Sequence, residues 1–267
     1  MQLDKLIVET RVRSAWSAID LGFSLARHFW LRAFCLYLLM AVPVYCLTLL
    51  LDKKYTYLPI FIIWWLKPVF ERPILFMISR ELFSEPMSVK RVFRQTRLWL
   101  KPSFFWITTW RRLSVYRGMT APIMLLEQPK GGAYSKRASV LSSKSSSETM
   151  WLTVVLYHIE TFLFLGIIAL IALFFPQAAE AIYKGLFVNA SERFIYTEIL
   201  GVLSMAIIAP FYAISGFMLY ISRRIELEGW DIEITFRNWM SDYRAPIEHT
   251  QINDGNLSKT ESLGVKQ

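Results

Sequence analysis

The amino-acid sequence predicts an all-α, polytopic membrane protein with about four transmembrane helices and additional amphipathic helices at the membrane surface. Of its 267 residues, 54% are hydrophobic, and the mean hydropathy is +0.35. A soluble fold could not bury this much apolar surface. Aromatic residues make up 15% and include ten Trp, as suits a chain with two membrane–water interfaces. Apolar stretches also run without charge for about 20 residues, the length that spans a hydrocarbon core of ~30 Å.

The chain is predicted to begin with an amphipathic helix in residues 1–32, followed by a first transmembrane pair in residues 33–79. In the first segment, apolar side chains recur every three or four positions, so that one helical face is apolar and the other polar. Residues 33–51 carry no charge and form the first expected span. The second, near residues 55–78, is interrupted by charged residues and prolines at 67–73.

Residues 80–149 are predicted to form a basic segment at the cytoplasmic side of the membrane. Within it, residues 88–101 have the pattern of one amphipathic helix that is N-capped by Ser88. Nucleic acid is not expected as a partner, because it would not need the apolar face of this helix. Residues 135–148 are rich in Ser and Lys, which is typical of a flexible linker. The basic face of the amphipathic helix is expected to contact anionic phospholipids through Lys90, Arg91, Arg94, Arg97 and Lys101.

A second transmembrane pair is predicted in residues 150–221, where the stretches 161–179 and 199–221 carry no charge. The last helix is expected to continue as a cytoplasmic extension in residues 222–244, before a polar, disordered tail in residues 245–267. With a cytoplasmic N-terminus, 24 of the 30 Lys and Arg residues lie on the cytoplasmic side. Because cytoplasmic loops are enriched in basic residues, both termini are expected in the cytoplasm.

Ionisable side chains at membrane depth are costly, so they indicate either a structural ion pair or a functional site. Lys67 and Glu71 are four residues apart, and on a continuous helix they would face the same way and pair, with Arg72 beside them. The alternative is that Pro68 and Pro73 break the helix. Freed carbonyl groups and these charges could then line a ligand or ion site.

His158 and Glu160 are a second polar candidate, at the inner end of the third span. Two residues apart on a helix, they point in different directions and do not form an acid–base pair by themselves. No His or Cys pair has the spacing of metal ligands, and neither a Gly-rich phosphate loop nor a Gly-x-Ser-x-Gly turn is present. We therefore expect no metal and no cofactor, and an enzyme is the less favoured class.

Two stretches resemble recurring segments of a group of uncharacterised bacterial inner-membrane proteins. The first, at residues 219–237, contains Arg224-x-x-x-Glu228-Gly229 followed by Asp231, and the second, at residues 64–83, contains Lys-Pro, acidic-Arg and Ser-Arg pairs. The group is similar to the membrane domains related to those attached to glycerophosphoryl diester phosphodiesterases, and is often encoded beside MoxR-type AAA ATPases. The resemblance implies a bacterial inner membrane and an accessory role, but no established activity.

These observations favour a non-enzymatic accessory or scaffold protein of the bacterial cell envelope. Its expected partners are the lipid bilayer, anionic phospholipids and, by the resemblance, other envelope membrane proteins or an AAA ATPase system. Two alternatives stay open. A transporter or lipid-handling protein using the broken second span requires Lys67 and Glu71 to face a cavity, and a membrane-embedded hydrolase using His158 and Glu160 requires a nucleophile or metal nearby.

Overall fold

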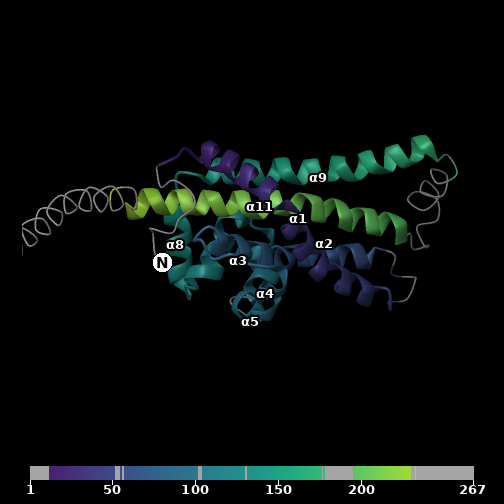
Figure 1. Ribbon diagram of the computed structural model, residues 1–267, viewed down its shortest axis with the longest axis horizontal. Helices are drawn as coiled ribbons and strands as arrows, with labels where there is room; N and C mark the ends of the chain where they lie inside the picture. Colours follow the sequence, from purple (N-terminus) through teal and green to yellow (C-terminus); the bar gives the residue numbers. More distant parts are fainter. Residues whose placement is uncertain are drawn as a thin grey trace, which may run out of the picture.

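The computed structural model of the chain describes residues 12–51, 57–101, 104–129, 131–175 and 195–229, together with 55, 177 and 232 (Figure 1). Within these residues every regular element is a helix or a helical turn, which confirms the predicted all-α class. The expected tail at residues 245–267 and most of the extension beyond residue 229 lie outside the described part, as do residues 1–11.

Three helices are long and apolar enough to span a membrane: α1 (Ala15–Thr48), α9 (Ser146–Phe174) and α11 (Ile195–Glu228). Helices α1 and α11 each have 34 residues, which at ~1.5 Å per residue gives a length of about 51 Å. Because this exceeds a hydrocarbon core of ~30 Å, each helix extends beyond it. In α1 the expected amphipathic helix and the expected first span are therefore one continuous helix, with no break near residue 32.

The second expected span, near residues 55–78, is not one long helix. It consists of α2 (Leu58–Phe70) and α3 (Arg72–Glu81), with Glu71 between them, so the predicted interruption is confirmed. Prolines also lie in the first turn of each helix, where a missing N–H group costs little. Pro68 is different, because it lies inside the last turn of α2.

The expected single helix at residues 88–101 is instead two short helices, α4 (Val89–Arg94) and α5 (Thr96–Leu100). The Ser88 cap is confirmed, since its hydroxyl accepts a hydrogen bond from the N–H of Arg91 at 3.4 Å. The apolar side packs on the protein itself: Trp99 is fully buried, and its indole N–H donates to the carbonyl of Val92 at 2.9 Å. The five basic side chains remain exposed.

Residues 104–142 form a series of short elements that pack along the longer helices. They are α6 (Phe104–Thr108), the 3₁₀ turn η2 (Trp110–Leu113), α7 (Arg117–Pro122), the π-helical turn η3 (Ile123–Glu127) and α8 (Gly132–Ser142). Most of the expected flexible linker at 135–148 is thus helical, in α8 and the start of α9.

Ion pairs hold α8 and the segment after it against the end of α11. Arg137 pairs with Glu127 and with Glu228, each at 2.7 Å, and Lys144 pairs with Glu226 at 2.8 Å. The composition of residues 135–148 predicts a linker because the segment does not contain these acidic partners, which lie in other parts of the chain. Glu127 lies in η3 and not in one of the three long apolar helices. Partial burial opposes its ionisation, but hydrogen bonds from Arg137 and Tyr220 lower its pKa below the usual value.

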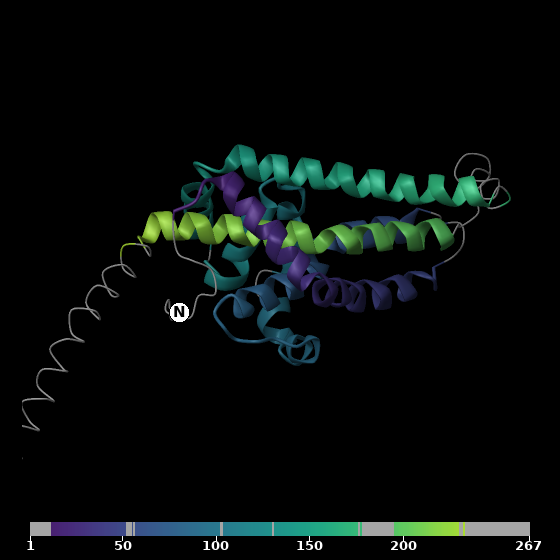
Figure 2. The same ribbon diagram turned by 45° about the horizontal axis from the view of Figure 1, so that its top comes forward.

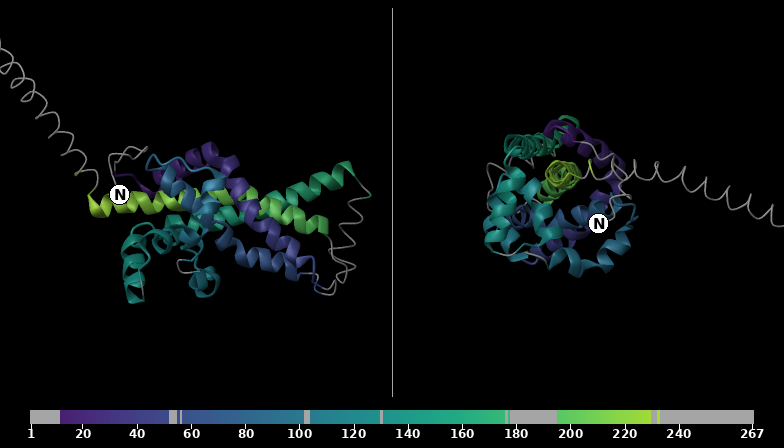
Figure 3. Two further views of the ribbon diagram at one scale, coloured as in Figure 1. Left: turned by 60° about the horizontal axis from the view of Figure 1, so that its bottom comes forward. Right: turned by 90° about the vertical axis from the view of Figure 1, so that its left-hand side faces the viewer.

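Helix α11 lies at the centre of the molecule, with other helices around it in the end-on view (Figure 3, right). Helix α1 crosses it obliquely (Figure 2) where Gly22 meets Ser215, and a Cβ atom on Gly22 would lie 2.4 Å from the Ser215 Cα. One residue further, a Cβ atom on Gly216 would lie 2.4 Å from the carbonyl oxygen of Gly118 in α7. Small residues thus permit two backbone contacts on consecutive residues of α11.

Candidate functional site

A cavity of about 280 Å³ lies between α2, η2, α9 and α11. Its wall on α11 includes Ile208 and Tyr212, each nine residues or ~13 Å from the nearer end of the uncharged stretch 199–221 at ~1.5 Å per residue. The cavity therefore lies beside the middle of the uncharged stretch of α11, while on α9 it lies at the end of the uncharged stretch 161–179, next to Glu160. Its other polar and charged lining residues are Lys67, Arg112, Ser114, Arg117, Thr153, Tyr157, His158 and Glu160.

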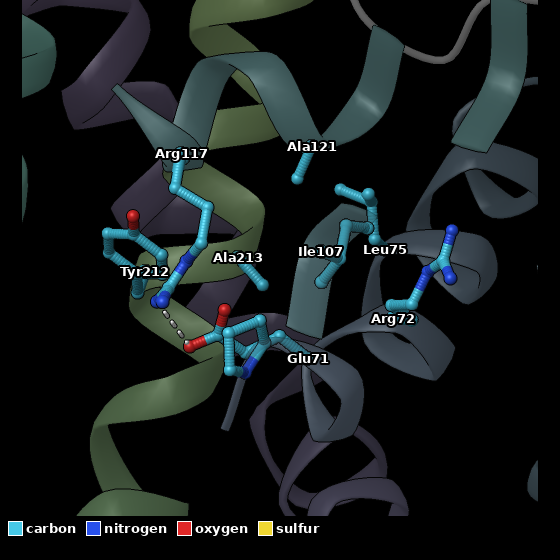
Figure 4. A pocket seen from close by; sticks show the side chains of 10 residues that line it. Glu71, Arg72, Leu75, Ile107, Arg117, Ala121, Tyr212 and Ala213 are labelled. Carbon is cyan, nitrogen blue, oxygen red and sulfur yellow. Dashed lines mark hydrogen bonds and ion pairs between the residues drawn. The ribbon is translucent and has the colours of Figure 1, made fainter. Parts of the chain in front are cut away.

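Lys67 and Glu160 form a buried ion pair that joins α2 to α9 across this cavity. Lys67 lies in the last turn of α2, and Glu160 lies near the middle of α9. Glu71 pairs instead with Arg117 of α7, with 3.2 Å between the Glu71 Oε1 and Arg117 Nη2 atoms (Figure 4). The expected pair of Lys67 with Glu71 is therefore wrong. The i, i+4 spacing placed them together, but α9 and α7 supply the charges that each one binds.

Arg112 completes the backbone hydrogen bonding of α2. Pro68 has no N–H group, so the carbonyl of Trp64, four residues earlier, lacks its helical donor. The Arg112 guanidinium supplies one, donating to the carbonyl of Trp64 at 2.7 Å and to that of Trp65 at 3.0 Å. It also lies over the Trp64 ring, 4.2 Å from the ring centre. The freed carbonyl that the prolines suggested is thus part of the site.

Two polar atoms near the ion pairs are fully buried without a hydrogen-bond partner among the described residues. They are the Arg117 Nε atom and the Tyr37 hydroxyl. Arg117 also lies 5.1 Å from the centre of the Tyr212 ring, and the Tyr212 hydroxyl is 3.4 Å from that of Thr153. Because buried polar groups are normally satisfied, these two atoms are unusual for a purely structural core.

Arg72 lies apart from the cavity. Figure 4 shows its side chain pointing away from the Glu71–Arg117 pair, and it donates a hydrogen bond to the carbonyl of Leu100 at 3.1 Å. The small pocket drawn there, of about 20 Å³, lies next to the larger cavity, with Arg117 and Tyr212 lining both. Of the five candidate residues from the sequence, Lys67, His158 and Glu160 therefore share the cavity wall, Glu71 is joined to it through Arg117, and Arg72 is separate.

His158 and Glu160 line the same cavity but use different partners. A ring nitrogen of His158 is hydrogen-bonded to the Val154 carbonyl of its own helix at 2.8 Å, while Glu160 binds Lys67. Ser114 and Thr153 also line the cavity, yet no hydrogen bond joins either hydroxyl to His158. A search of the described residues also finds no group of three His, Cys, Asp or Glu side chains that could hold a metal ion.

Sequence reasoning missed Arg112 and Arg117, which it counted among the cytoplasmic basic residues. Both are buried, at 7% and 8% exposed, because the segment from α6 to α7 packs beside α2 and α11. The signal that could have revealed Arg112 was Pro68, whose effect on the Trp64 carbonyl requires a donor from another part of the chain.

The charges at this site leave one positive charge uncompensated. Lys67 and Arg117 are each paired with a carboxylate, whereas the only partners of Arg112 among the described residues are carbonyl groups and an aromatic ring. A buried guanidinium without a counter-ion is costly. The arrangement therefore favours binding of an anion.

In the stretch that carries the resemblance, Arg224 pairs with Glu228 at 2.6 Å, and Gly229 follows the helix with a φ of +63°. This left-handed conformation at the end of a helix favours glycine. Asp231 lies outside the described residues. Comparison of the chain with models of protein families, with curated proteins and with solved structures finds no match.

Proposed function

We propose that the protein is a lipid-handling membrane protein that holds the head of a membrane lipid in the cavity between α2, η2, α9 and α11. The observation that carries this proposal is a charged cavity beside the middle of the uncharged stretch of α11 and at the inner end of the uncharged stretch of α9. Ionisable groups in or beside membrane spans mark substrate pathways in transporters.

The size of the cavity favours a head group rather than a complete lipid. A cavity of about 280 Å³ is too small to enclose a lipid with two acyl chains. The chains would have to lie outside, on apolar surface. Helix α9 offers such surface, because beyond Glu160 it exposes large apolar side chains that include Phe162, Leu165 and Leu173.

An accessory role in the bacterial cell envelope, at the inner membrane, is part of the same proposal. It is supported by the five exposed basic side chains of α4, α5 and Lys101, which suit contact with an anionic leaflet. The partners would be anionic phospholipids and other envelope membrane proteins. The hydrolase alternative has no such support, since within the described part of the chain no nucleophile is hydrogen-bonded to His158.

The test blocks the cavity with a bulky side chain. Val154 and Val155 are neighbours on α9 and are both exposed, but only Val154 lines the cavity. Native mass spectrometry of the detergent-purified protein should detect a retained lipid in the parent and in Val155→Trp. In Val154→Trp the lipid should be lost. A parent that retains no lipid, or equal retention in both variants, would overturn the proposal.

A further inference from the structure

We infer that the cavity selects a phosphodiester lipid with one net negative charge, such as a phosphatidylglycerol, and that Arg112 is the residue that sets this preference. The inference rests on the proposed function and goes further, because it names the class of head group. The cations that line the cavity differ in their partners, because Lys67 and Arg117 bind carboxylates and Arg112 binds only carbonyl groups and an aromatic ring.

Arg112 is the cation with capacity to spare. Its Nε and Nη2 atoms donate to the carbonyl groups of Trp65 and Trp64, but no described residue accepts a hydrogen bond from its Nη1 group. The side chain is nevertheless 93% buried, since only 7% is exposed. Those two contacts also fix the plane of the guanidinium, so the remaining donors are held in place before a ligand arrives.

Arg117 lies on the same cavity wall but offers no free donor to a ligand. One of its terminal nitrogens binds Glu71, and its Nε atom is fully buried, so it is not open to the cavity. Guanidinium groups bind phosphate oxygens through several directed N–H donors, which an ammonium group cannot do in the same plane. The free Nη1 group of Arg112 therefore matches the non-bridging oxygens of a phosphate group.

The net charge of the ligand follows from the charge balance of the site. Lys67 is neutralised by Glu160, and Arg117 is neutralised by Glu71, which leaves the single charge of Arg112. A phosphodiester with no other charge carries one negative charge and compensates it. A zwitterionic lipid brings an additional ammonium group, which would have to take a carboxylate from one of the existing pairs.

The experiment measures which lipid the purified protein retains from equimolar phosphatidylglycerol and phosphatidylethanolamine. Native mass spectrometry should find phosphatidylglycerol enriched at least ~10-fold in the parent, which corresponds to ~1.4 kcal/mol. Arg112→Gln keeps a donor for the Trp64 carbonyl but removes the charge, so it should still bind lipid while losing the preference. Arg112→Lys should retain part of the preference.

The matched control is Arg80→Gln combined with Glu85→Gln, an exposed ion pair that does not line this cavity. This double variant removes one charge of each sign and leaves the charge of Arg112 in place, so it should keep the preference for phosphatidylglycerol. Loss of the preference in this variant would assign the selection to charges outside the cavity and would overturn the role of Arg112.

The remaining outcomes separate the two proposals. Suppose that the parent retains lipid without a head-group preference and that Val154→Trp loses this lipid. That result would overturn this inference and leave the proposed function standing. Absence of any retained lipid would overturn both. Glycerol phosphate added at millimolar concentration should not displace the lipid. Displacement of the lipid would assign the site to a soluble phosphate compound instead.

Discussion

Lys67 and Glu160 are separated by 93 positions in the sequence, and their ion pair joins two helices that a local reading of the chain treats separately. Both side chains are about nine-tenths buried. Removing one partner from such a pair leaves a charge in a low-dielectric setting, whereas removing both also removes that penalty.

We therefore expect Lys67→Met and Glu160→Gln to lower the free energy of unfolding by roughly 3–5 kcal/mol each. The double variant should recover much of this loss, which a double-mutant cycle on detergent-purified protein will measure. The exposed pair of Arg80 with Glu85, at 3.1 Å, is the control, and its cycle should give a coupling below ~1 kcal/mol. Additive losses for Lys67 and Glu160 would contradict a structural pair.

On α11, two other backbones approach closely at the consecutive residues Ser215 and Gly216. A methyl group on Gly216 has no space, since the nearest atom is the carbonyl oxygen of Gly118 at 2.4 Å. Backbone atoms cannot move aside as the end of a flexible side chain can, so α7 would have to shift away from α11. Such a shift also moves Arg117, which lies at the first position of α7.

Gly216→Ala should therefore destabilise the protein by about 1–3 kcal/mol, the range for an overpacked core, and should weaken lipid retention. The matched control is Gly166→Ala in α9, where nothing lies within 4 Å of the added methyl group. That change should be neutral or stabilise α9 by up to ~1 kcal/mol, because alanine favours a helix. Thermal unfolding of both variants measures the difference, and equal midpoints would refute the close approach of α7.

The elements that sequence predicted best are those specified by neighbouring residues. The break between α2 and α3 follows from prolines and charges within seven residues, and the Ser88 cap from a hydroxyl at a helix start. Helix α8 was missed, because Glu127 and Glu228, the carboxylates that pair with its Arg137, lie outside the segment. Composition indicates a linker only when such partners are absent.

Only the part of the candidate site that neighbouring residues specify was predictable from the sequence. Lys67 and Glu160 stood out singly, as charges next to apolar stretches, but hydropathy does not reveal which charges meet. Arg112 and Arg117 belong to a segment whose basic composition suggested a position at the membrane surface. Their burial depends on the packing of η2 and α7 against α2 and α11, which periodicity within one segment cannot show.

Across the whole molecule, the distribution of basic residues predicts which side each end of the bundle faces. The N-terminal end of α2 and the junction between α8 and α9 should lie on opposite sides of the membrane. Both places offer an exposed residue for labelling, Tyr57 at the first and Ser143 at the second. The native cysteines, Cys35 and Cys46, are also exposed and have to be replaced first.

Single cysteines at these two positions should react differently with a membrane-impermeant maleimide added to intact cells. Tyr57→Cys should be labelled from outside, and Ser143→Cys only after the membrane has been permeabilised. Labelling of Ser143→Cys in intact cells would reverse the orientation. Equal labelling of both positions after permeabilisation shows that neither thiol is hidden by the fold.

The dependence of α2 on Arg112 also sets an order for the biosynthesis of this protein. When α2 leaves the ribosome, the carbonyl group exposed by Pro68 has no donor and Lys67 has no counter-ion. The first need is met only after residue 112 has been made, and the second only after residue 160. We therefore expect α2 to become stable in lipid only once α9 has been synthesised.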